Sequence, residues 1–351
     1  MSKLDDAAQN LVGLKLDTGW NVIEKIEKVP GQTGSFFSVC YKIERDGEIC
    51  FLKAFDFSKF IQIAATGKAT VDIMTDMLNA HRYERDLSEL CKSKHLDKVV
   101  IVKEAGEILV SGHTYPIVPY LIFDMADGDV RKRMMFSNTL DVTWKLKSLH
   151  SISVGLKQLH GIEVSHQDLK PSNILLFNEE SKIGDVGRSL CRKMISPYDG
   201  TVFNGDWNYA PPEILYGVYE ADWTKRTFST DCYLLGSMIT FYFTGMSMTA
   251  LIRTELPDNF SWDYWRGSFD DVKEYILNAY DIVLQKISLT IPGDELKKEL
   301  KKIIEYLCYP IPEKRGHPKS LHIPQAQYSL ERFITTLAML YKKSEFNLLK
   351  I

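Results

Sequence analysis

The longest stretch of the chain without a charged residue spans 21 residues, from Cys232 to Ile252. A single helix of this length could cross a bilayer, but the pattern is also typical of the buried helix of a large domain. Hydroxyl side chains and two glycines interrupt the apolar residues, and an aspartate, Asp231, comes directly before them. These polar groups favour a buried helix in a soluble protein over a membrane span.

The composition is also typical of a soluble globular protein. The 351 residues are 45% hydrophobic, which is enough for one large domain or for two lobes. The formal net charge is only −3, so no overall positive field attracts nucleic acid or an anionic membrane. The six cysteines lack the spacing of a zinc site, and the N-terminus lacks a signal peptide and a myristoylation pattern. We therefore expect a cytoplasmic protein of unspecified oligomeric state.

The apolar residues divide the chain into two parts. Strand-like patterns, bounded by turn signals, occur at 20–29, 36–44, 48–57, 98–110 and 114–125. A helical pattern at 70–92 interrupts them, and the patterns after residue 126 are mostly helical. The first three strands predict an antiparallel meander. The chain as a whole predicts a small strand-rich lobe followed by a larger helical lobe.

One short segment, 166–173 ("HQDLKPSN"), combines residue types that phosphoryl transfer requires. That reaction needs phosphates held in place, metal ions, a group that orients the attacking hydroxyl, and positive charge on the transferring group. Asp168 can accept the hydroxyl proton, and Lys170, two residues later in an extended loop, can contact the γ-phosphate. The side-chain oxygen of Asn173 suits a hard cation such as Mg²⁺.

This segment resembles the catalytic loop of eukaryotic-type serine/threonine protein kinases, H-R-D-x-K-x-x-N. Companion motifs occur in the order of that family. "KIGDVGRS" resembles the metal-binding D-F-G element, with Asp185 as the Mg²⁺ ligand, Val186 in place of Phe, and Gly187 retained. Upstream, "ICFLKAF" resembles the strand whose lysine, here Lys53, reaches the α- and β-phosphates. The resemblance covers roughly residues 20 to 340.

Three further matches, together with His166 of the loop itself, imply structural roles. "YAPPEIL" resembles the end of the activation segment and supplies Glu213, and "CYPIPEKRG" supplies Arg315 as its ion-pair partner. "STDCYLLGSMI" resembles a buried helix whose aspartate, Asp231, ties down the catalytic-loop backbone. By this resemblance the uncharged stretch is the central helix of the larger lobe.

The resemblance implies an α+β, bilobal protein-kinase-like fold with ATP and Mg²⁺ (or Mn²⁺) as cofactors and a protein substrate that offers Ser or Thr. The kinase domain would span 20–340, with a small antiparallel-sheet N-lobe at about 20–125 and a larger helical C-lobe at about 126–340. Residues 1–19 would be an N-terminal extension, and residues 341–351 a C-terminal tail.

The resemblance also implies a nucleotide site. Its ATP-binding residues would be Gly34, Ser35, Val39, Lys53, Asp124, Ala126 and Leu175, with Phe123 as gatekeeper. Val39 would lie above the adenine and Leu175 below it. Glu84 is the candidate ion-pair partner of Lys53, because it shares a helix face with Leu87 and Cys91. The alternative is that Glu84 is an exposed residue of a charged helix.

The chain departs from the family pattern in several places. "PGQTGSFFSV" matches the glycine-rich loop only in part, with Phe37 where a third glycine would allow close approach to phosphate. Phe51 replaces a small residue that packs on adenine, so its ring must stack on the base, rotate away or crowd the pocket. The segment 57–77 is longer than the family needs. It predicts either an added turn or helix that could serve as a docking surface, or a helix with an irregular start.

Two departures bear on regulation. Gln167 replaces an arginine that gathers a phosphorylated activation loop, so we expect activity without loop phosphorylation. Asp206 replaces a threonine and would repel Asp168 unless Lys170 sits between them, or it serves as a capping residue.

Three functions are therefore considered: an active Ser/Thr kinase, which the residues favour, a pseudokinase scaffold, and a small-molecule phosphotransferase. The scaffold is argued against because the residues that carry catalysis are all present. Small-molecule phosphotransferases generally lack a lysine at the position of Lys170, the A-P-E element and the late arginine.

Overall fold

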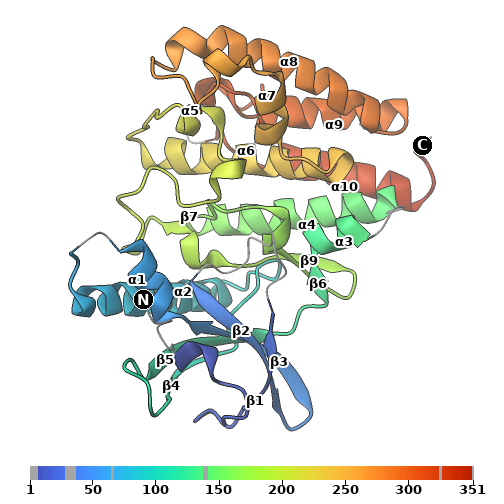
Figure 1. Ribbon diagram of the computed structural model, residues 1–351. Helices are drawn as coiled ribbons and strands as arrows, with labels where there is room; N and C mark the ends of the chain where they lie inside the picture. The colour runs from blue at the N-terminus through green and yellow to red at the C-terminus, as the bar shows by residue number, and fades with distance from the viewer. Residues whose placement is uncertain (1–6, 28–36, 65–66, 137–140, 324–325, 350–351) are drawn as a thin grey trace.

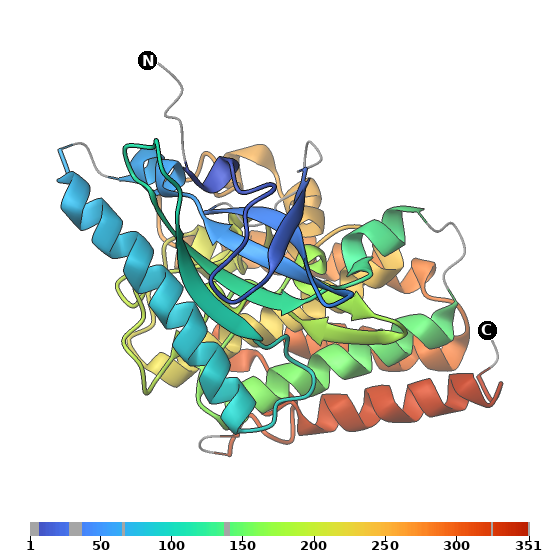
Figure 2. The same ribbon diagram turned by 90° about the horizontal axis from the view of Figure 1, so that it is seen from below.

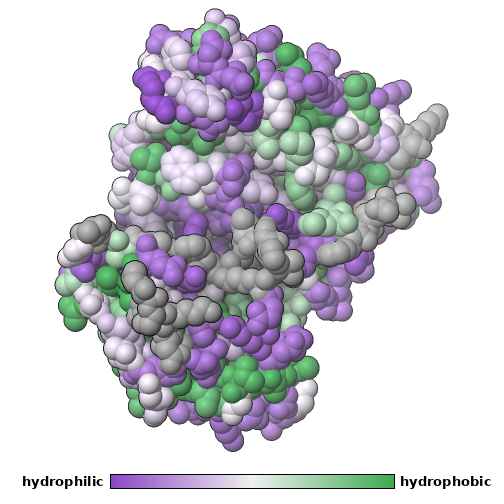
Figure 3. Space-filling model, viewed as in Figure 1, coloured by the Kyte–Doolittle hydropathy of each residue, from purple (hydrophilic) through white to green (hydrophobic). Residues whose placement is uncertain are grey.

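The computed structural model describes residues 7–27, 37–64, 67–136, 141–323 and 326–349. A small sheet with two helices forms one end of the molecule, and a larger group of helices forms the other (Figure 1). This is the α+β, two-lobed arrangement that the sequence predicted. On the face shown in Figure 3, hydrophilic residues gather where the two lobes meet.

The N-lobe is built on a five-stranded antiparallel sheet in the order β1-β2-β3-β5-β4. Its strands are β1 (Asn21–Ile26), β2 (Ser38–Arg45), β3 (Glu48–Phe55), β4 (Glu104–Leu109) and β5 (Ile117–Asp124). Asp46 and Gly47 join β2 to β3 with positive φ angles of 53° and 83°, as a tight hairpin turn requires. The meander ends after β3, because β3 pairs with β5 and the chain first passes through two helices.

Those helices are α1 (Phe57–Ile63) and α2 (Thr70–Ser93). Asp56 caps α1 by accepting a hydrogen bond from the backbone nitrogen of Ser58 at 3.0 Å. The long segment 57–77 therefore forms an added helix and the first turns of α2, which runs along one side of the sheet (Figure 2). Val71 in those turns is 71% exposed, so the start of α2 extends beyond the packed core.

The two faces of the sheet are covered differently. One face packs against α1 and α2. The other packs against the N-terminal segment, which includes the 3₁₀ helix η1 (Ala7–Gln9) and in which Ala7, Leu11 and Leu16 are buried. The described part of the predicted N-terminal extension therefore contributes to the core of the N-lobe, because the outer face of the sheet is apolar and needs a cover.

The C-lobe is mostly helical. Its α-helices are α3 (Val130–Phe136), α4 (Val142–Gly161), α5 (Pro212–Leu215), α6 (Trp223–Thr244), α7 (Met248–Glu255), α8 (Lys273–Thr290), α9 (Asp294–Leu307) and α10 (Glu331–Glu345). Its 3₁₀ helices are η2 (Pro171–Asn173), η3 (Val186–Arg188), η4 (Trp207–Tyr209), η5 (Asp258–Phe260), η6 (Asp270–Val272) and η7 (Pro312–Lys314). Its short strands are β6 (Gly128–Asp129), β7 (Val164–Ser165), β8 (Ile174–Phe177), β9 (Glu180–Ile183) and β10 (Leu190–Cys191).

The uncharged stretch is not one helix, so the prediction of a single buried helix was wrong in part. Gly245 ends α6 in the left-handed region (φ 78°). Ser247 then caps α7 by accepting a hydrogen bond from the nitrogen of Ala250 at 3.1 Å. Most of α6 is buried, as expected. Within the described residues no single helix is long and apolar enough to span a bilayer. The pair α6 and α7 meets that test only together, with a 77° bend.

Candidate active site

Three elements from both lobes bring charged side chains together where the lobes meet. Lys53 on β3 donates hydrogen bonds to both carboxylate oxygens of Glu84 on α2, each at 2.8 Å. The same ammonium lies 2.9 Å from Oδ1 of Asp185, which precedes η3 in the C-lobe. Glu84 is only 3% exposed, so the structure excludes the alternative of a solvated helix residue. We call these three residues the triad.

The triad has one cation for two carboxylates. Burial opposes the charged form of Lys53, but the Asp185 and Glu84 carboxylates outweigh it, so the pKa of the ammonium is raised. Burial also opposes ionisation of Asp185, yet the attraction of Lys53 lowers the pKa of that carboxyl to about 2. Burial raises the pKa of Glu84 against the attraction of Lys53. With Glu84 and Asp185 both ionised, the triad carries one surplus negative charge, which a further cation would neutralise.

The backbone around Asp185 explains why a glycine follows it. Asp185 itself is in the left-handed region, with φ 55°, and it starts the turn of η3. A Cβ atom on Gly187 would lie 2.6 Å from Oε2 of Glu84. Because Gly187 has no side chain, it leaves the space in which Glu84 meets Lys53. Val186, between Asp185 and Gly187 in the sequence, is buried in the C-lobe core.

The catalytic-loop backbone is held by one buried aspartate on α6. Asp231 accepts hydrogen bonds from the backbone nitrogens of His166 and Gln167, each at 2.9 Å. It also accepts one from Ser165 Oγ at 2.8 Å and lies 2.8 Å from Nε2 of His160. The His166 ring lies 2.9 Å from the carbonyl oxygen of Gly184 and so connects the loop to the segment that carries Asp185. These contacts fix the position of the loop relative to α6 and to the segment of Asp185.

The carboxylate of Asp168 has a donor on each oxygen. Oδ1 accepts the backbone N–H of Asp206 at 2.8 Å. Oδ2 lies 3.1 Å from Nζ of Lys170 and accepts from Nδ2 of Asn173 at 3.1 Å. Lys170 also lies 3.5 Å from Oδ2 of Asp206, so its charge stands between the two carboxylates. Asp206 in addition caps η4 through the nitrogen of Asn208, so both alternatives considered for this residue hold.

The side chain of Gln167 is held by residues outside the activation segment. Its backbone is left-handed (φ 65°), and its side chain donates to Ser165 Oγ at 2.7 Å and to the carbonyl oxygen of Thr227 at 3.1 Å. Both contacts lie within the C-lobe and belong to the surroundings of Asp231. The glutamine amide therefore stabilises the catalytic loop.

A residue to which the sequence analysis assigned no role, Tyr83, joins the activation segment to α2. The hydroxyl of Tyr83, next to Glu84, donates to the carbonyl oxygen of Ser189 at 2.7 Å. It accepts the backbone N–H of Cys191 at 3.2 Å. Burial raises the pKa of the Tyr83 hydroxyl, so this link stays uncharged. The spacing of Tyr83 and Leu87 along the helix indicates burial, but it does not show which groups the hydroxyl contacts.

A second buried ion pair lies deeper in the C-lobe. Arg315 donates to both carboxylate oxygens of Glu213, at 2.7 and 2.9 Å. Its remaining donors reach Ser229 and the carbonyl oxygen of Tyr309. The guanidinium is fully buried, and the charges of this pair are balanced. The pair joins α5, at the end of the activation segment, to the loop after α9.

The expected position of Val39 above the adenine is wrong. Opposed residues in an antiparallel sheet point to the same face, and Val39 is opposed to Ala54, whereas Lys53 is opposed to Cys40. Val39 is buried in the cluster on the outer face of the sheet. Cys40 lies on the face of Lys53, and the alternation of Val39, Tyr41 and Ile43 is the signal that could have shown this register.

The other residues expected around the base have mixed positions. Leu175 on β8 is partly buried, and a Cβ atom on Gly184 would lie 3.0 Å from its Cδ1. Asp124 is exposed at the end of β5, and Ala126 follows it, partly buried. The rings of Phe51 and Phe123 lie on the Lys53 face with centroids 6.3 Å apart. Gly34 and Ser35 lie outside the described residues.

The oxygen donors near the triad fit a divalent cation. The Gly184 nitrogen donates to the carbonyl oxygen of Asn173 at 2.8 Å, which keeps Asn173 beside the segment of Asp185. The Asn173 amide nitrogen is used by Asp168, so its side-chain oxygen is the atom suited to a metal. An amide oxygen and a carboxylate next to surplus negative charge are the ligands that Mg²⁺ prefers.

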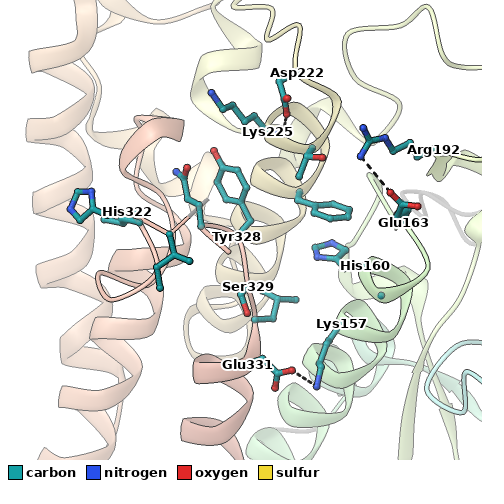
Figure 4. Close-up of a pocket in the computed structure, with 17 residues that line it drawn as sticks. Lys157, His160, Glu163, Arg192, Asp222, Lys225, His322, Tyr328, Ser329 and Glu331 are labelled. Carbon is teal, nitrogen blue, oxygen red and sulfur yellow. Dashed lines mark hydrogen bonds and ion pairs between the residues drawn. The ribbon is translucent and has the colours of Figure 1, made fainter. Parts of the chain in front are cut away.

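A separate groove of about 880 Å³ lies between the end of α4, the start of α6 and residues 321–323 and 327–331 (Figure 4). Its ion pairs are Lys157–Glu331 at 2.5 Å and Arg192–Glu163 at 3.4 Å. His160 in its wall is the residue that contacts Asp231. The groove is thus connected to Asp231 through His160, and Lys53, Asp168 and Asp185 do not line it.

Comparison with known proteins agrees with this geometry. Residues 75–325 match the protein kinase domain family. The chain is 27% identical over 285 residues to mitogen-activated protein kinase 5 of Arabidopsis thaliana, covering 75% of this chain and 73% of that protein. It is 27% identical over 215 residues to a putative serine/threonine-protein kinase of Acanthamoeba polyphaga mimivirus, covering 59% and 67%. Mitogen-activated protein kinase 4 of Arabidopsis thaliana is 27% identical over 250 residues, 65% of each chain.

The matched region begins after Lys53, so the contact of this lysine with Glu84 is a finding of the structure alone. The other motif residues, from Glu84 to Arg315, lie within it. The chain belongs to the protein kinase domain family, and the enzyme class predicted from its motifs, a protein serine/threonine kinase, is confirmed.

Proposed function

We propose that this protein transfers the γ-phosphoryl group of ATP, with Mg²⁺ or Mn²⁺, to Ser or Thr hydroxyls of protein substrates. The observation that carries the proposal is one convergence. The triad of Lys53, Glu84 and Asp185 lies beside a loop that presents Asp168, Lys170 and Asn173, and the Asn173–Gly184 hydrogen bond connects the two groups. Because the family match begins later, we also propose that the kinase domain includes the strands of the N-lobe from about residue 20.

Each residue has a role that its surroundings support. Asp168, held by three donors, orients the substrate hydroxyl and accepts its proton. Lys170 beside it stabilises the charge on the transferring group. Lys53, fixed by Glu84, positions the phosphates of ATP. Asn173 and Asp185 would hold the metal, which when bound neutralises phosphate charge.

The pseudokinase alternative rests on Phe37, Phe51, Gln167 and Asp206, and the geometry favours catalysis over it. The Phe37 ring packs on Phe60 with centroids 4.9 Å apart, and the Phe51 ring packs toward Phe123. Neither aromatic contact interrupts the Lys53–Glu84 hydrogen bonds. The Glu213–Arg315 pair supports a protein kinase over a small-molecule phosphotransferase, since the resemblance associates that pair with protein kinases.

We further propose that activity does not require phosphorylation of the activation segment. Gln167 is engaged with Ser165 and Thr227 and offers no positive charge to a phosphate. The uncharged hydroxyl of Tyr83 already joins α2 to the segment in the state in which Lys53 meets Glu84. A cytoplasmic location is also proposed, since none of the six cysteines forms a disulfide.

The central test is incubation of the purified protein with labelled ATP, Mg²⁺ and generic protein acceptors, beside Asp168→Asn. Loss of the general base is expected to lower the rate about 10²- to 10⁴-fold, with ATP affinity largely retained. Phosphate should appear on Ser and Thr after acid hydrolysis. Equal labelling by the two proteins, or no labelling by either, would reject the proposal.

Treatment of the purified protein with a broad phosphatase tests the regulatory part. The dephosphorylated protein should keep most of its turnover, whereas Tyr83→Phe should lower it several-fold in both the treated and untreated forms. A phosphatase-treated protein that has lost most of its activity would show that loop phosphorylation is needed after all.

A further inference from the structure

Two features in which the chain departs from the family pattern contact each other. One is Phe37, at the position of the third glycine, and the other is α1, in the long segment 57–77. The ring of Phe37 packs on Phe60 of α1 with centroids 4.9 Å apart. The carbonyl oxygen of Phe37 accepts the backbone N–H of Asp56, the N-cap residue of α1, at 2.9 Å. The added helix therefore fixes the start of β2 through one side-chain contact and one backbone hydrogen bond.

A cation of the other lobe lies near the same ring. Arg188, the last residue of η3, has its Cζ atom 5.5 Å from the centroid of the Phe37 ring. A cation is attracted to an aromatic face within roughly 6 Å of its centroid. Arg188 forms no ion pair with a carboxylate of the described residues, so its charge is available to the ring. Phe37 therefore contacts α1 in the N-lobe and η3 in the C-lobe.

The guanidinium is held in this position by the activation segment. Its Nη1 donates to the carbonyl oxygen of Asn204 at 3.2 Å, and the Asn204 side chain donates to the carbonyl oxygen of Arg188 at 3.4 Å. Asp185 precedes Arg188 by three residues. Burial opposes ionisation of Asp185, but the charges of Lys53 and, to a smaller extent, Arg188 lower the pKa of that carboxyl. The guanidinium therefore lies between the start of β2 and the proposed metal site.

We propose that Phe37 and Arg188 form a clasp between the two lobes that positions the start of β2 next to the segment of Asp185 for nucleotide binding. Phe60 supports the clasp from α1. A glycine at position 37 would have no ring for Arg188 to contact. A contact that favours the binding arrangement before the nucleotide arrives raises the apparent affinity. Phe37 and Arg188 are thus positioning residues. The inference rests on the proposed function, because it concerns the nucleotide site of the kinase.

The test measures the Kd of MgADP for the full chain by titration calorimetry. Phe37→Leu keeps an apolar side chain but removes the aromatic face, and Arg188→Met keeps much of the length of the side chain but removes the charge. Each substitution should raise the Kd about three- to ten-fold. The double variant should bind no more weakly than the weaker of the two, because one contact can be lost only once. Phe37→Tyr keeps the aromatic face and should restore the wild-type Kd.

Two control variants remove similar groups outside the clasp. Arg192→Met removes an exposed arginine of the same segment, whose partner is Glu163. Tyr115→Leu removes a ring that packs on Phe57 of α1 with centroids 4.4 Å apart. Both should bind MgADP as the wild type does. In Phe37→Leu the KM for ATP should rise with the Kd while kcat stays close to the wild-type value, as expected when binding rather than chemistry is affected.

Additive effects of the two substitutions would overturn the clasp, because Arg188 would then act on the nucleotide independently of Phe37. An unchanged Kd in Phe37→Leu, or an equal rise in Tyr115→Leu, would overturn it as well. A wild-type protein that binds no MgADP would overturn the proposed kinase function instead.

Discussion

Two of the buried charged clusters described above, the Glu213–Arg315 pair and the triad, differ in their charge balance. Arg315 and Glu213 neutralise each other, and the other guanidinium donors are used by Ser229 and Tyr309. Lys53 instead faces two carboxylates, and Asp185 is 31% exposed at the side chain. The charges of Glu213 and Arg315 cancel. In the triad one carboxylate charge is not cancelled, and the exposed part of Asp185 allows a ligand to reach it. Buried ion pairs are thus structural or functional according to what remains unneutralised.

Matched neutral substitutions in the two clusters should have opposite consequences. Asp185→Asn should lower phosphorylation at least about 100-fold, because charge stabilisation worth several kcal/mol at the metal-phosphate site is lost. Stability should fall by only about 1–2 kcal/mol, since Lys53 retains Glu84. Activity is measured with labelled ATP over a range of Mg²⁺ concentrations, and stability by urea denaturation. Unchanged activity at every Mg²⁺ concentration would remove Asp185 from the proposed metal site.

Glu213→Gln should show the reverse. It leaves Arg315 buried without a counter-charge, which costs about 3–5 kcal/mol of unfolding free energy. Activity per folded molecule should change less than in Asp185→Asn. Glu331→Gln is the matched control, because its pair with Lys157 is exposed and worth at most about 1 kcal/mol. If the two glutamine variants were equally stable in urea, the balanced pair would not have the structural role assigned to it.

Gly187→Ala should damage the triad without removing any of its charges. The new methyl group would meet Glu84 Oε2 at 2.6 Å, and overpacking of this kind costs about 1–3 kcal/mol. Since Glu84 must move from Lys53, the KM for ATP should rise about ten-fold or more. Gly161→Ala, where a Cβ atom has nothing within 4 Å, should behave as wild type. An ATP titration that does not distinguish the two variants would contradict the steric role of Gly187.

The smallest effect is expected in the pH dependence of stability. The pKa of Asp185 is lowered from an ordinary 3.8 to about 2, so its charge stabilises the fold above pH 3.8, and that contribution is lost as the pH falls toward 2. Wild type should lose up to about 1.4 kcal/mol per pH unit more than Asp185→Asn across this window. Urea denaturation of both proteins at several pH values measures the difference. Parallel curves would mean that Lys53 does not favour ionised Asp185.

Much of the site could be predicted because motif residues keep their order along the chain. Asp168, Asp185, Asp231 and the pair of Glu213 with Arg315 were named from short segments, and the structure brings each to its expected neighbours. The predicted position of Val39 above the adenine was wrong because the partial glycine-rich match set the strand register one residue away from the observed pairing. In a strand, a shift of one residue moves a side chain to the other face.

The prediction of a single helix for the uncharged stretch was wrong for a local reason. Its length and lack of charge predicted burial, which α6 has, but Gly245 and Ser247 introduce a bend that hydropathy does not register. The contacts of Tyr83 were also missed, because residues distant in sequence form them.

The order of residues alone determines the two-part organisation, the family resemblance and the identity of the groups that carry the chemistry. These depend on local spacing and on functional groups, which the linear chain already contains. Folding decided which face of β2 lies on the side of Lys53, that Lys170 lies between two carboxylates, and which ion pair stays unbalanced. Such properties depend on distance and burial among groups as far apart as Lys53 and Asp185, and both are set only when the two lobes pack together.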